Sequence, residues 1–564
     1  MSTRFKASNH QIKDLNGCLL TKTEDQNKRW VEHFQQLLNR PPPTNSPTLL
    51  PSDQELDINC EPPTETEVKK AIKSLKNNKS AGPDDIPAEL LKADIDTSAH
   101  MLHALIAKIW DQEFIPSEWK EGLLVKLPKK GDLSLCKNYR GIMLLSTAGK
   151  VLNRIILERM REAVDDILRE NQAGFRQSRS TSDQIATLRI IVEQSLEWRT
   201  PLYINFIDYE KAFDSLDRNT LWDLMASYGI PRKIISLVKN TYEGTSCRIL
   251  HESGLTEKFS IKTGVRQGCL LSPFLFLLAI DWATKETTSD SRNGIQWTLL
   301  DQLEDLDFAD DLALLSHTHS QMQAKTSKLE SISSKLGLRI NTDKTKIMRV
   351  NSKSNEHISI ANRDIEDVTS FTYLGSVINI TGGTDEDVQA RIGKARSAFN
   401  ILGNIWRSRE ITTATKIRIF NSNVKPVLLY GSETWRMTEK TVSKLQTFLN
   451  RCLRRILQIY WPDTISNVTL WETTGQLPVK EQIKKRKWTW IGHILRRSNT
   501  CIARQALSWN PQGSRRRGRP RNTWKRDTER TIKLKGYTWN QIEQKARDRG
   551  GWRRFICGLC SEME

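Results

Sequence analysis

The chain has 564 residues, enough for several domains, and its 86 Lys and Arg against 66 Asp and Glu give a formal net charge of +20. This excess of positive charge favours a polyanionic partner, although it also fits ribosomal and membrane-surface proteins. Nine scattered cysteines and a polar N-terminus without a signal peptide indicate an intracellular protein of the nucleus or cytoplasm, and the strongest apolar stretch, 269–283, is too short and too polar to span a membrane.

The first 107 residues are predicted to be mainly scaffolding. Four apolar residues recur at helical spacing near the start, namely Trp30, Phe34, Leu37 and Leu38. A semi-rigid linker is indicated by the prolines that follow, at positions 41, 42, 43, 47, 51, 62 and 63. Helical spacing resumes over 64–76. We therefore expect a helix and linker over 1–63 and a supporting segment over 64–107.

Three carboxylates are predicted to lie at the ends of neighbouring strands. The apolar run 202–207 indicates a buried strand that ends at Asp208. Asp310 and Asp311 stand between two short apolar runs, which is the pattern of a β-hairpin tip. Adjacent like charges raise each other's pKa, and a divalent cation removes that cost because carboxylate oxygens are natural Mg²⁺ ligands. A solvated turn is the alternative for Asp310 and Asp311 taken alone.

This arrangement of carboxylates suggests a reaction. Carboxylates on adjacent strand ends can hold two metal ions about 3.5–4 Å apart, as used for in-line displacement at phosphorus. The chemistry that the pattern suggests is nucleotidyl transfer.

The C-terminal third changes from helical to strongly basic. Two apolar faces at helical spacing are expected, through Val388, Ile392, Ala395, Phe399, Leu402 and Trp406 and through Val442, Leu445, Leu449, Cys452 and Ile456. The tail 476–564 carries 23 Lys and Arg against 7 Asp and Glu, so it holds +16 of the chain's +20. Its tryptophans, at 488, 490, 509, 524, 539 and 552, can stack bases or form a small core, and we favour the core.

One segment of this tail is predicted to contact nucleic acid, because cationic side chains meet phosphates and its Gly and Pro residues indicate an exposed loop. The cations are Arg515, Arg516, Arg517, Arg519 and Arg521, and the segment also resembles a nuclear-localisation patch. Cys557 and Cys560 are spaced like zinc ligands, but no second pair follows at ligand spacing, so a zinc site is not predicted.

Over roughly Lys79 to Gly375 the chain resembles the reverse transcriptase of non-LTR (LINE-like) retrotransposons. Eight motifs follow the family's order: Ser80-Ala81-Gly82-Pro83-Asp84, Asn138-Tyr139-Arg140-Gly141-Ile142, Gln172-Ala173-Gly174-Phe175-Arg176, the segment Leu202 to Asp214, Gly264 to Pro273, Phe308-Ala309-Asp310-Asp311, Gly337 to Asn341 with Lys344-Thr345-Lys346, and Tyr373-Leu374-Gly375. The Phe-Ala-Asp-Asp form resembles a non-LTR element more than a retrovirus.

The resemblance implies an α+β fold of the right-hand polymerase type, with a helical, basic C-terminal region. The implied divisions are an N-terminal helix and linker over 1–63, a fingers extension over 64–107, fingers and palm over 108–378, a thumb and connector over 379–475, and a basic Trp-containing region over 476–564. In the family an endonuclease precedes the fingers. Only a helix and a linker do so here, so we expect a truncated copy or an incomplete gene model.

The resemblance also implies roles for single residues. Asp208, Asp310 and Asp311 would be catalytic and would hold two Mg²⁺ ions, or Mn²⁺. The implied nucleotide contacts are Lys129 and Arg140 on the triphosphate, Phe213 beneath the sugar as a steric gate against ribonucleotides, Gln267 and Gly268 in a loop near the nucleotide and template, and Lys344 near the leaving pyrophosphate. The implied partners are an RNA template, a DNA primer and dNTPs, with no membrane partner and no indication of oligomeric state.

The same residues also fit other functions. The chain can be a polymerase-dead, domesticated nucleic-acid-binding protein, although the complete set of three carboxylates argues against this reading. It can also be a non-functional retroelement fragment. Within the enzyme class, a group II intron-type maturase or an RNA-dependent RNA polymerase are alternatives, and the aromatic ring of Phe213 argues against the latter.

Overall fold

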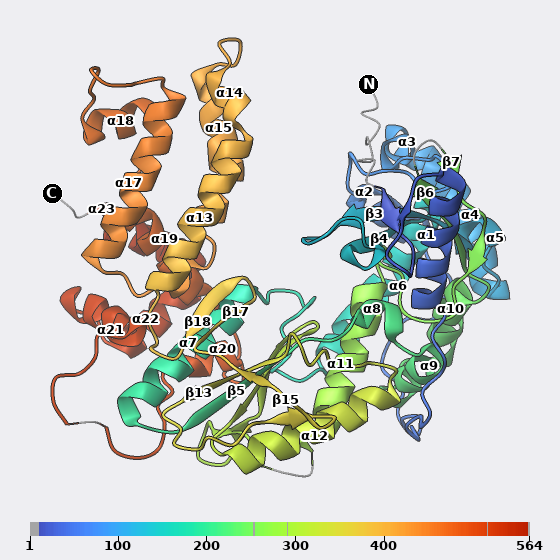
Figure 1. Ribbon diagram of the computed structural model, residues 1–564, viewed down its shortest axis with the longest axis horizontal. Coiled ribbons are helices and arrows are strands. Elements are labelled where there is room, and N and C mark those ends of the chain that lie inside the picture. Colours follow the sequence, from blue (N-terminus) through green and yellow to red (C-terminus); the bar gives the residue numbers. More distant parts are fainter. Residues whose placement is uncertain (1–10, 252–253, 290–291, 516, 562–564) are drawn as a thin grey trace. The chain divides into compact units, whose positions relative to one another are not determined.

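The computed structural model describes residues 11–251, 254–289, 292–515 and 517–561, which fold into two units (Figure 1). The first unit comprises Met1–Arg176, Asp208–Asp290 and Thr326–Asn341, and the second comprises Gln177–Ile207, Ser291–Lys325 and Thr342–Glu564. Within the described ranges, no helix is both long enough and apolar enough to cross a membrane.

The first unit contains a sheet centred on β3 (Glu121–Pro128). This strand pairs antiparallel with β4 (Tyr139–Leu144) and parallel with β6 (Ser246–His251), and β7 (Gly254–Leu255) and β8 (Phe259–Ser260) pair with β6. The remaining elements of this unit are β1 (Ile12–Lys13), β2 (Leu19–Leu20), α1 (Thr23–Leu38), α2 (Glu65–Ser74), α3 (Ala88–Ala93), α4 (Ile95–Gln112), α5 (Ser117–Lys120), α6 (Thr147–Asp165), α8 (Ala212–Ser215), α9 (Arg218–Ser227), α10 (Arg232–Tyr242) and α11 (Ser272–Thr288), with a short 3₁₀ turn at Cys136–Asn138.

The two helices expected near the N-terminus are confirmed. α1 buries Trp30, Phe34 and Leu38, which lie four residues apart and therefore on one face. α2 begins with a capping box, in which the Thr64 side chain accepts from the Glu67 backbone N–H and Glu67 accepts from the Thr64 backbone N–H. These helices scaffold the first unit.

The second unit is built on a sheet in the order β11 (Asp305–Phe308), β12 (Asp311–Ser316), β5 (Leu202–Ile207), β13 (Lys346–Val350) and β16 (Glu366–Asp367). Every residue of β5 is buried, because the strand lies between β12 and β13 and is covered on its faces. The first three neighbouring pairs are antiparallel, and β13 and β16 are parallel. Predominantly antiparallel sheets with helices outside them confirm the predicted α+β class.

Short strand pairs and many helices complete the second unit. The further elements are α7 (Thr181–Trp198), β9 (Ile295–Gln296), β10 (Gln302–Leu303), β14 (Ser359–Ile360), β15 (Arg363–Asp364), β17 (Ser370–Tyr373), β18 (Ser376–Asn379), α13 (Asp385–Ile401), α14 (Gly403–Arg407), α15 (Thr413–Asn423), α16 (Lys425–Leu428), α17 (Glu439–Ile456), α18 (Asn467–Thr474), α19 (Val479–Leu495), α20 (Ile502–Ala506), α21 (Trp524–Leu534), α22 (Trp539–Arg547) and α23 (Arg549–Ser561), with a 3₁₀ turn at Ser432–Thr434. α12 (His319–Lys335) contributes to both units.

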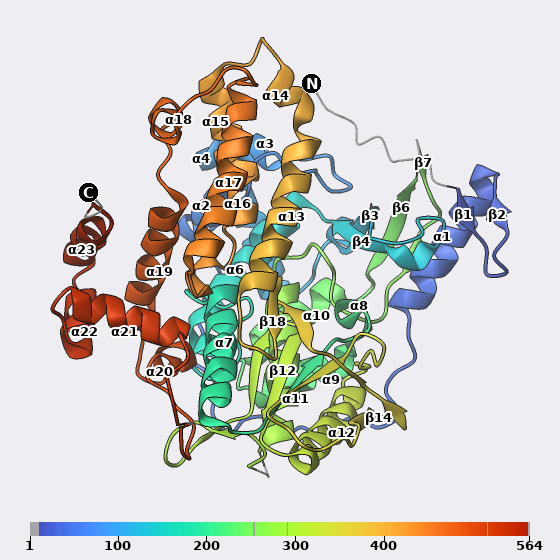
Figure 2. The ribbon, with the colours of Figure 1, turned by 60° about the vertical axis from the view of Figure 1, so that its left-hand side comes forward.

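α7 is buried almost all round and is shared by the sheet and the C-terminal helices of the second unit (Figure 2). The Trp490 indole Nε1–H donates to Asp183 Oδ1 at 2.9 Å, and the Trp524 backbone N–H donates to Glu193 Oε2 at 2.9 Å. Five of the six tail tryptophans are buried, namely Trp488, Trp490, Trp509, Trp524 and Trp552. The expectation that they form a core is confirmed, and this core is continuous with that of the sheet rather than separate.

A second core of this unit joins α13 and α17, which run alongside α15 (Figure 1). Val388, Ile392 and Phe399 on α13 and Leu445 and Leu449 on α17 are buried there. These residues repeat every three or four positions, so the structure confirms the predicted face on α17 and the predicted face on α13 as far as Phe399. α13 ends at Ile401, and Trp406 lies on the next helix, α14.

Candidate active site

The predicted strand end and hairpin are both present. β11 and β12 pair with Phe308 opposite Asp311, so Ala309 and Asp310 form the turn, and Ala309 adopts a positive φ of 59°. On its other edge β12 pairs with β5, with Leu312 opposite Ile207. Asp208 is the next residue after Ile207, and Asp311 directly precedes Leu312. The register therefore brings all three carboxylates to the same end of the sheet.

Buried polar side chains of the second unit donate hydrogen bonds to the backbone of the β11–β12 hairpin. The Tyr373 hydroxyl donates to the Leu306 carbonyl at 2.8 Å, and the Gln184 amide donates to the Asp307 carbonyl at 2.9 Å. Burial, with Asp307 and Asp311 nearby, raises the pKa of Tyr373 well above its ordinary value, so this hydroxyl stays a donor. The Tyr373-Leu374-Gly375 motif thus has a physical role in supporting the turn.

A buried lysine balances charge on the same sheet. Lys325 Nζ lies 2.5 Å from Glu304 Oε2 and also donates to the Leu315 carbonyl at 2.7 Å. Burial lowers the pKa of Lys325, and Glu304 opposes that change. This pairing was not foreseeable from the sequence, because Glu304 precedes β11 whereas Lys325 lies on α12, and neither residue stands in a motif.

The exposure of the three carboxylates suits metal binding from solvent. Asp208 and Asp310 are half-buried and Asp311 is exposed. Within the described residues, no group of three or more His, Cys, Asp or Glu side chains is already gathered to hold a metal ion. Mg²⁺ usually takes one or two carboxylates together with substrate phosphates and water, rather than an all-protein cage. Carboxylate oxygens that solvent reaches are donors of the kind that Mg²⁺ binds.

In the first unit, Phe213 has one side supported by aromatic rings. It stacks on Phe276 with ring centroids 4.4 Å apart at 20°, and Phe175 meets it edge-on at 6.3 Å. Its backbone carbonyl accepts from the Val265 N–H at 2.7 Å. The half-buried ring is therefore fixed in direction by both its stacking and its backbone.

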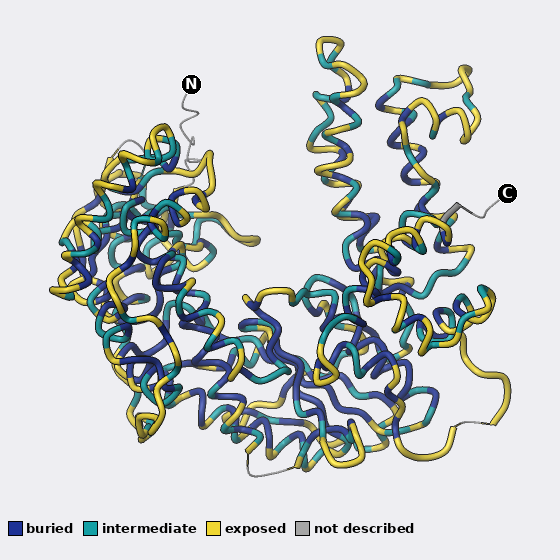
Figure 3. Tube along the Cα trace, turned by 180° about the vertical axis from the view of Figure 1, so that it is seen from behind, coloured by how far each residue is buried: buried dark blue, intermediate teal, exposed yellow. Residues whose placement is uncertain are grey.

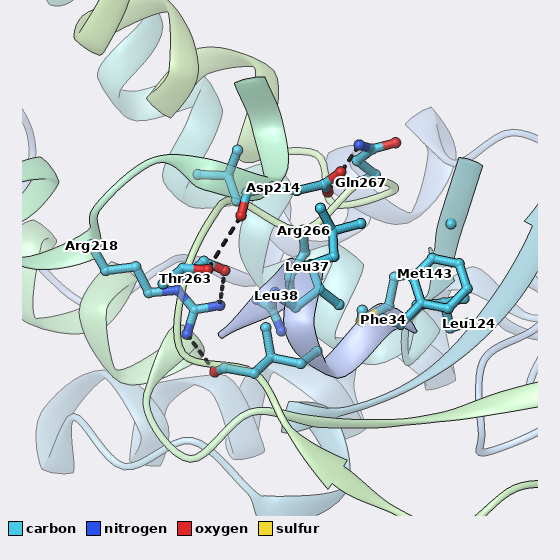
Figure 4. A pocket seen from close by; sticks show the side chains of 13 residues that line it. Phe34, Leu37, Leu38, Leu124, Met143, Asp214, Arg218, Thr263, Arg266 and Gln267 are labelled. Atoms are coloured by element: carbon cyan, nitrogen blue, oxygen red, sulfur yellow. Dashed lines mark hydrogen bonds between the residues drawn. The ribbon is translucent and has the colours of Figure 1, made fainter. Parts of the chain in front are cut away.

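The loop that contains Gln267 and Gly268 is locked onto β4. The Met143 N–H donates to the Gln267 carbonyl at 2.7 Å. Gly268 has a φ of +121°, and a Cβ there would lie 2.3 Å from the Met143 carbonyl oxygen, so only glycine fits. The Gln267 side-chain amide donates to Asp214 Oδ1 at 3.0 Å (Figure 4).

Asp214, for which the sequence predicted no role, lies near three cations. Burial raises the pKa of Asp214 to about 6, and Lys211, the Gln267 hydrogen bond, Arg40 and Lys129 oppose that rise. Burial also lowers the pKa of Lys211. Both residues lie in the segment that follows Asp208, but only the fold shows that Asp214 turns toward Gln267.

A buried arginine, Arg218, links backbone segments of the first unit near Asp214. Arg218 donates to the carbonyls of Gly264, Tyr242 and Ile261 at 3.0 Å each. It lines, with Asp214, a cavity of about 20 Å³, which is roughly the space of one water molecule (Figure 4). Because the cavity is this small, it supports the loop and has no room for a nucleotide.

The three predicted cationic contacts all point to solvent. Lys129 and Arg140 lie on the β3–β4 hairpin, where Arg140 is opposite Leu127 and the Lys129 N–H donates to the Asn138 carbonyl at 2.7 Å. Both side chains are exposed. Lys344 is also exposed, in the turn before β13.

The arginine-rich segment of the tail is exposed as far as it is described. Arg515, Arg517, Arg519 and Arg521 are exposed, and Arg516 lies outside the described residues. Arg515 Nη1 is 3.8 Å from Glu197 Oε1, so its charge is partly balanced. The other three described arginines leave their charge toward solvent.

Comparison with known proteins identifies the central part of the chain. Residues 127–378 match the family model described as reverse transcriptase (RNA-dependent DNA polymerase), and residues 398–430 match a domain of unknown function. The chain is 25% identical over 434 residues to the transposon TX1 uncharacterized 149 kDa protein of Xenopus laevis, which covers 74% of this chain and 31% of that protein.

A second relative is the probable RNA-directed DNA polymerase from transposon BS of Drosophila melanogaster, 25% identical over 82% of this chain and 52% of its own length. The chain thus spans about a third to a half of these relatives. Among solved structures, apo telomerase from Candida tropicalis truncated from its C-terminal domain aligns with a TM-score of 0.34 and 15% identity, over 49% of this chain and 59% of that one.

The order of the motifs, the carboxylates at the sheet end and the family match agree. Residues 127–378 match the reverse transcriptase family, and over most of its length the chain is similar to proteins of non-LTR, LINE-like retrotransposons.

Proposed function

We propose that this chain is an RNA-directed DNA polymerase that extends a DNA primer on an RNA template during retrotransposon replication. One observation carries the proposal: within a reverse transcriptase domain, the strand register brings Asp208, Asp310 and Asp311 to one end of a sheet. Carboxylates so placed suit nucleotidyl transfer, in which catalysis is mostly positioning and charge stabilisation.

The reverse transcriptase family uses divalent metal ions, and we assign their ligands here to Asp208 and Asp310, with Asp311 as a further ligand or a partner of Asp310. Two Mg²⁺ ions are proposed, and Mn²⁺ has the same preference for oxygen donors. When bound, the metals would lower the pKa of the primer 3′-hydroxyl and neutralise charge on the triphosphate. The support is the donor set: hard carboxylate oxygens that solvent reaches.

The remaining proposed contacts position the substrates. Lys129 and Arg140 extend from one hairpin as exposed cations, and a guanidinium can bind a triphosphate in a bidentate manner. Lys344 is proposed to receive the leaving pyrophosphate. Phe213, with its stacked support, would lie under the sugar and exclude a 2′-hydroxyl, while Gln267 and Gly268 would border the nascent base pair.

Nucleic-acid binding is proposed to extend to the tail. Its exposed arginines suit phosphate contact, which is independent of sequence and weakened by salt. The divisions expected from the sequence, with the polymerase over 108–378 and a thumb over 379–475, remain part of this proposal.

A primer-extension assay tests the proposed function. The full chain should extend a labelled DNA primer on an RNA template when dNTPs and Mg²⁺ are supplied, and a chelator should stop it. A chain that binds the template–primer but adds no nucleotide with Mg²⁺ or Mn²⁺ would contradict the proposal and favour a catalytically inactive, domesticated binding protein.

A further inference from the structure

Far along the chain from the carboxylates, two neighbouring aromatic side chains are left in solvent. Tyr460 is 58% exposed and Trp461 is 89% exposed. They lie in the segment that joins α17 to α18, most of which is exposed (Figure 3). A tryptophan contributes most to folding when its large apolar surface is buried. The folded chain therefore gains little from Trp461, and its ring face is open to a ligand.

The same two rings border a pocket that is rich in arginine. The pocket has a volume of about 550 Å³, within the roughly 300–1,000 Å³ range of small-ligand sites. Arg451, Arg454 and Arg455 line it from α17, where spacings of three and four residues place side chains on one face. Neither Asp nor Glu occurs among the described residues that line it.

The arginines divide into one that is held and two that are available. Arg454 Nη2 donates to Asn467 Oδ1 at 2.8 Å and to the Ile465 carbonyl at 3.2 Å. Arg451 and Arg455 are exposed and have no carboxylate partner in the described part of the chain, and the Arg455 guanidinium lies over the Phe399 ring at 5.9 Å. Two guanidinium groups thus face solvent beside two exposed rings.

The floor of the pocket is fixed by side-chain hydrogen bonds. Asn450 Nδ2 donates to Asn467 Oδ1 at 2.9 Å, and Asn450 Oδ1 accepts from Trp471 Nε1 at 2.9 Å. These bonds tie α17 to α18, so the pocket is present before any ligand binds, which lowers the entropic cost of binding.

We infer that this pocket binds single-stranded nucleic acid, with an unpaired base stacked on Trp461 and the adjacent phosphates on Arg451 and Arg455. Aromatic faces together with cations along a backbone path are the two components of single-strand sites. A duplex offers no free base face inside its stack, so single strands are favoured. The inference does not rest on the polymerase reaction, since none of these residues is proposed to bind a metal ion or the incoming nucleotide.

The experiment measures the affinity of the full chain for short labelled single-stranded RNA and DNA oligonucleotides at several salt concentrations. Trp461→Ala should weaken binding by about 5- to 150-fold without altering the salt slope, because stacking releases no counterions. Trp461→Phe should restore most of the affinity. Arg451→Gln should instead lower the log–log salt slope by about 0.7. Ile401→Ala and Arg418→Gln, at exposed positions outside the pocket, serve as matched controls.

Photocrosslinking provides a readout on the unaltered chain. A thiouridine-containing oligonucleotide should attach to the peptide that contains Tyr460 and Trp461, and a duplex competitor should displace it poorly. Wild-type affinity and slope in Trp461→Ala, with crosslinks only elsewhere, would overturn the inference and leave the exposed rings to a protein partner. Extension of a saturating, pre-annealed template–primer by Trp461→Ala should be normal. An inactive polymerase would leave these binding results unchanged, so the two proposals fail separately.

Discussion

At the scale of single residues, the role of the three carboxylates depends on the strand register that brings them together. A shift of one residue between β12 and β5 would move every side chain to the opposite face of the sheet. Tyr373 and Gln184 bond the carbonyls of β11 and so oppose such a shift. We therefore expect the position of the hairpin carboxylates to depend on Tyr373.

Phe213 is the residue on which sugar choice depends in this account. Phe213→Val should raise the ratio of ribonucleotide to deoxyribonucleotide incorporation by roughly 10- to 100-fold, because the ring that excludes the 2′-hydroxyl is gone. The measurement is the ratio of the two incorporation efficiencies. Phe175→Leu, which alters only the edge-on neighbour, should leave the ratio unchanged. An unchanged ratio in an active Phe213→Val chain would make Phe213 a packing residue.

Asp214 predicts a measurable dependence of stability on pH. Burial raises its pKa to about 6 from 3.8, so the folded chain holds the proton more tightly than the unfolded chain does. Its contribution is therefore full below about pH 4 and is lost as the pH rises through about 6, a change of roughly 3 kcal/mol. Asp214→Asn retains an acceptor for Gln267 and should remove this dependence.

The test compares apparent melting temperatures of the wild-type chain and Asp214→Asn at pH 4 and pH 7. The melting temperature of Asp214→Asn, relative to that of the wild type, should increase as the pH rises. If the two melting temperatures differ by the same amount at both pH values, burial does not raise the pKa of Asp214.

At the scale of elements, local sequence patterns predicted those helices and strands whose formation depends on residues close together in the chain. The alternation and apolar runs located β5, the β11–β12 hairpin and the apolar faces of α13 and α17, because each pattern is a property of one segment. The pairing of β5 with the β11–β12 hairpin was predicted from the carboxylates at their ends, but other pairings between distant segments were not foreseeable. The parallel pairing of β3 with β6 and the hydrogen bond from Gln267 to Asp214 both depend on how segments meet in the fold.

The exposed arginine segment between α20 and α21 is the element for which a binding role is easiest to test. Replacing Arg515, Arg516, Arg517, Arg519 and Arg521 by Gln should lower the log–log salt slope of template binding by about 0.7 per lost contact on single strands, or 0.9 on duplex DNA. The pairing with Glu197 makes Arg515 the smaller contributor. The control variant carries Arg553→Gln and Arg554→Gln, at two exposed positions on α23. An unaltered slope in the soluble five-residue variant would exclude phosphate contact by this segment.

At the scale of the whole molecule, the tail is part of the second unit's core rather than an appended module. The sequence indicated that its tryptophans are buried but not that they share a core with α7 and β5, since that contact joins residues more than 300 positions apart. Deleting Gln476–Glu564 should therefore expose this core and sharply lower soluble yield. The five-residue Gln variant should stay soluble. A soluble, active truncation would show that the second unit folds without its tail.

The most direct test of the central claim separates chemistry from binding at the carboxylates. Asp208→Asn and Asp310→Asn keep the shape of the side chain but weaken it as a metal ligand. Each should reduce primer extension on an RNA template by roughly 10²- to 10⁴-fold while leaving template–primer affinity unchanged. Asp343→Asn, an exposed acid beside Lys344, should extend normally. If either Asp208→Asn or Asp310→Asn extends primers at close to the wild-type rate, the assignment of these carboxylates to catalysis is wrong.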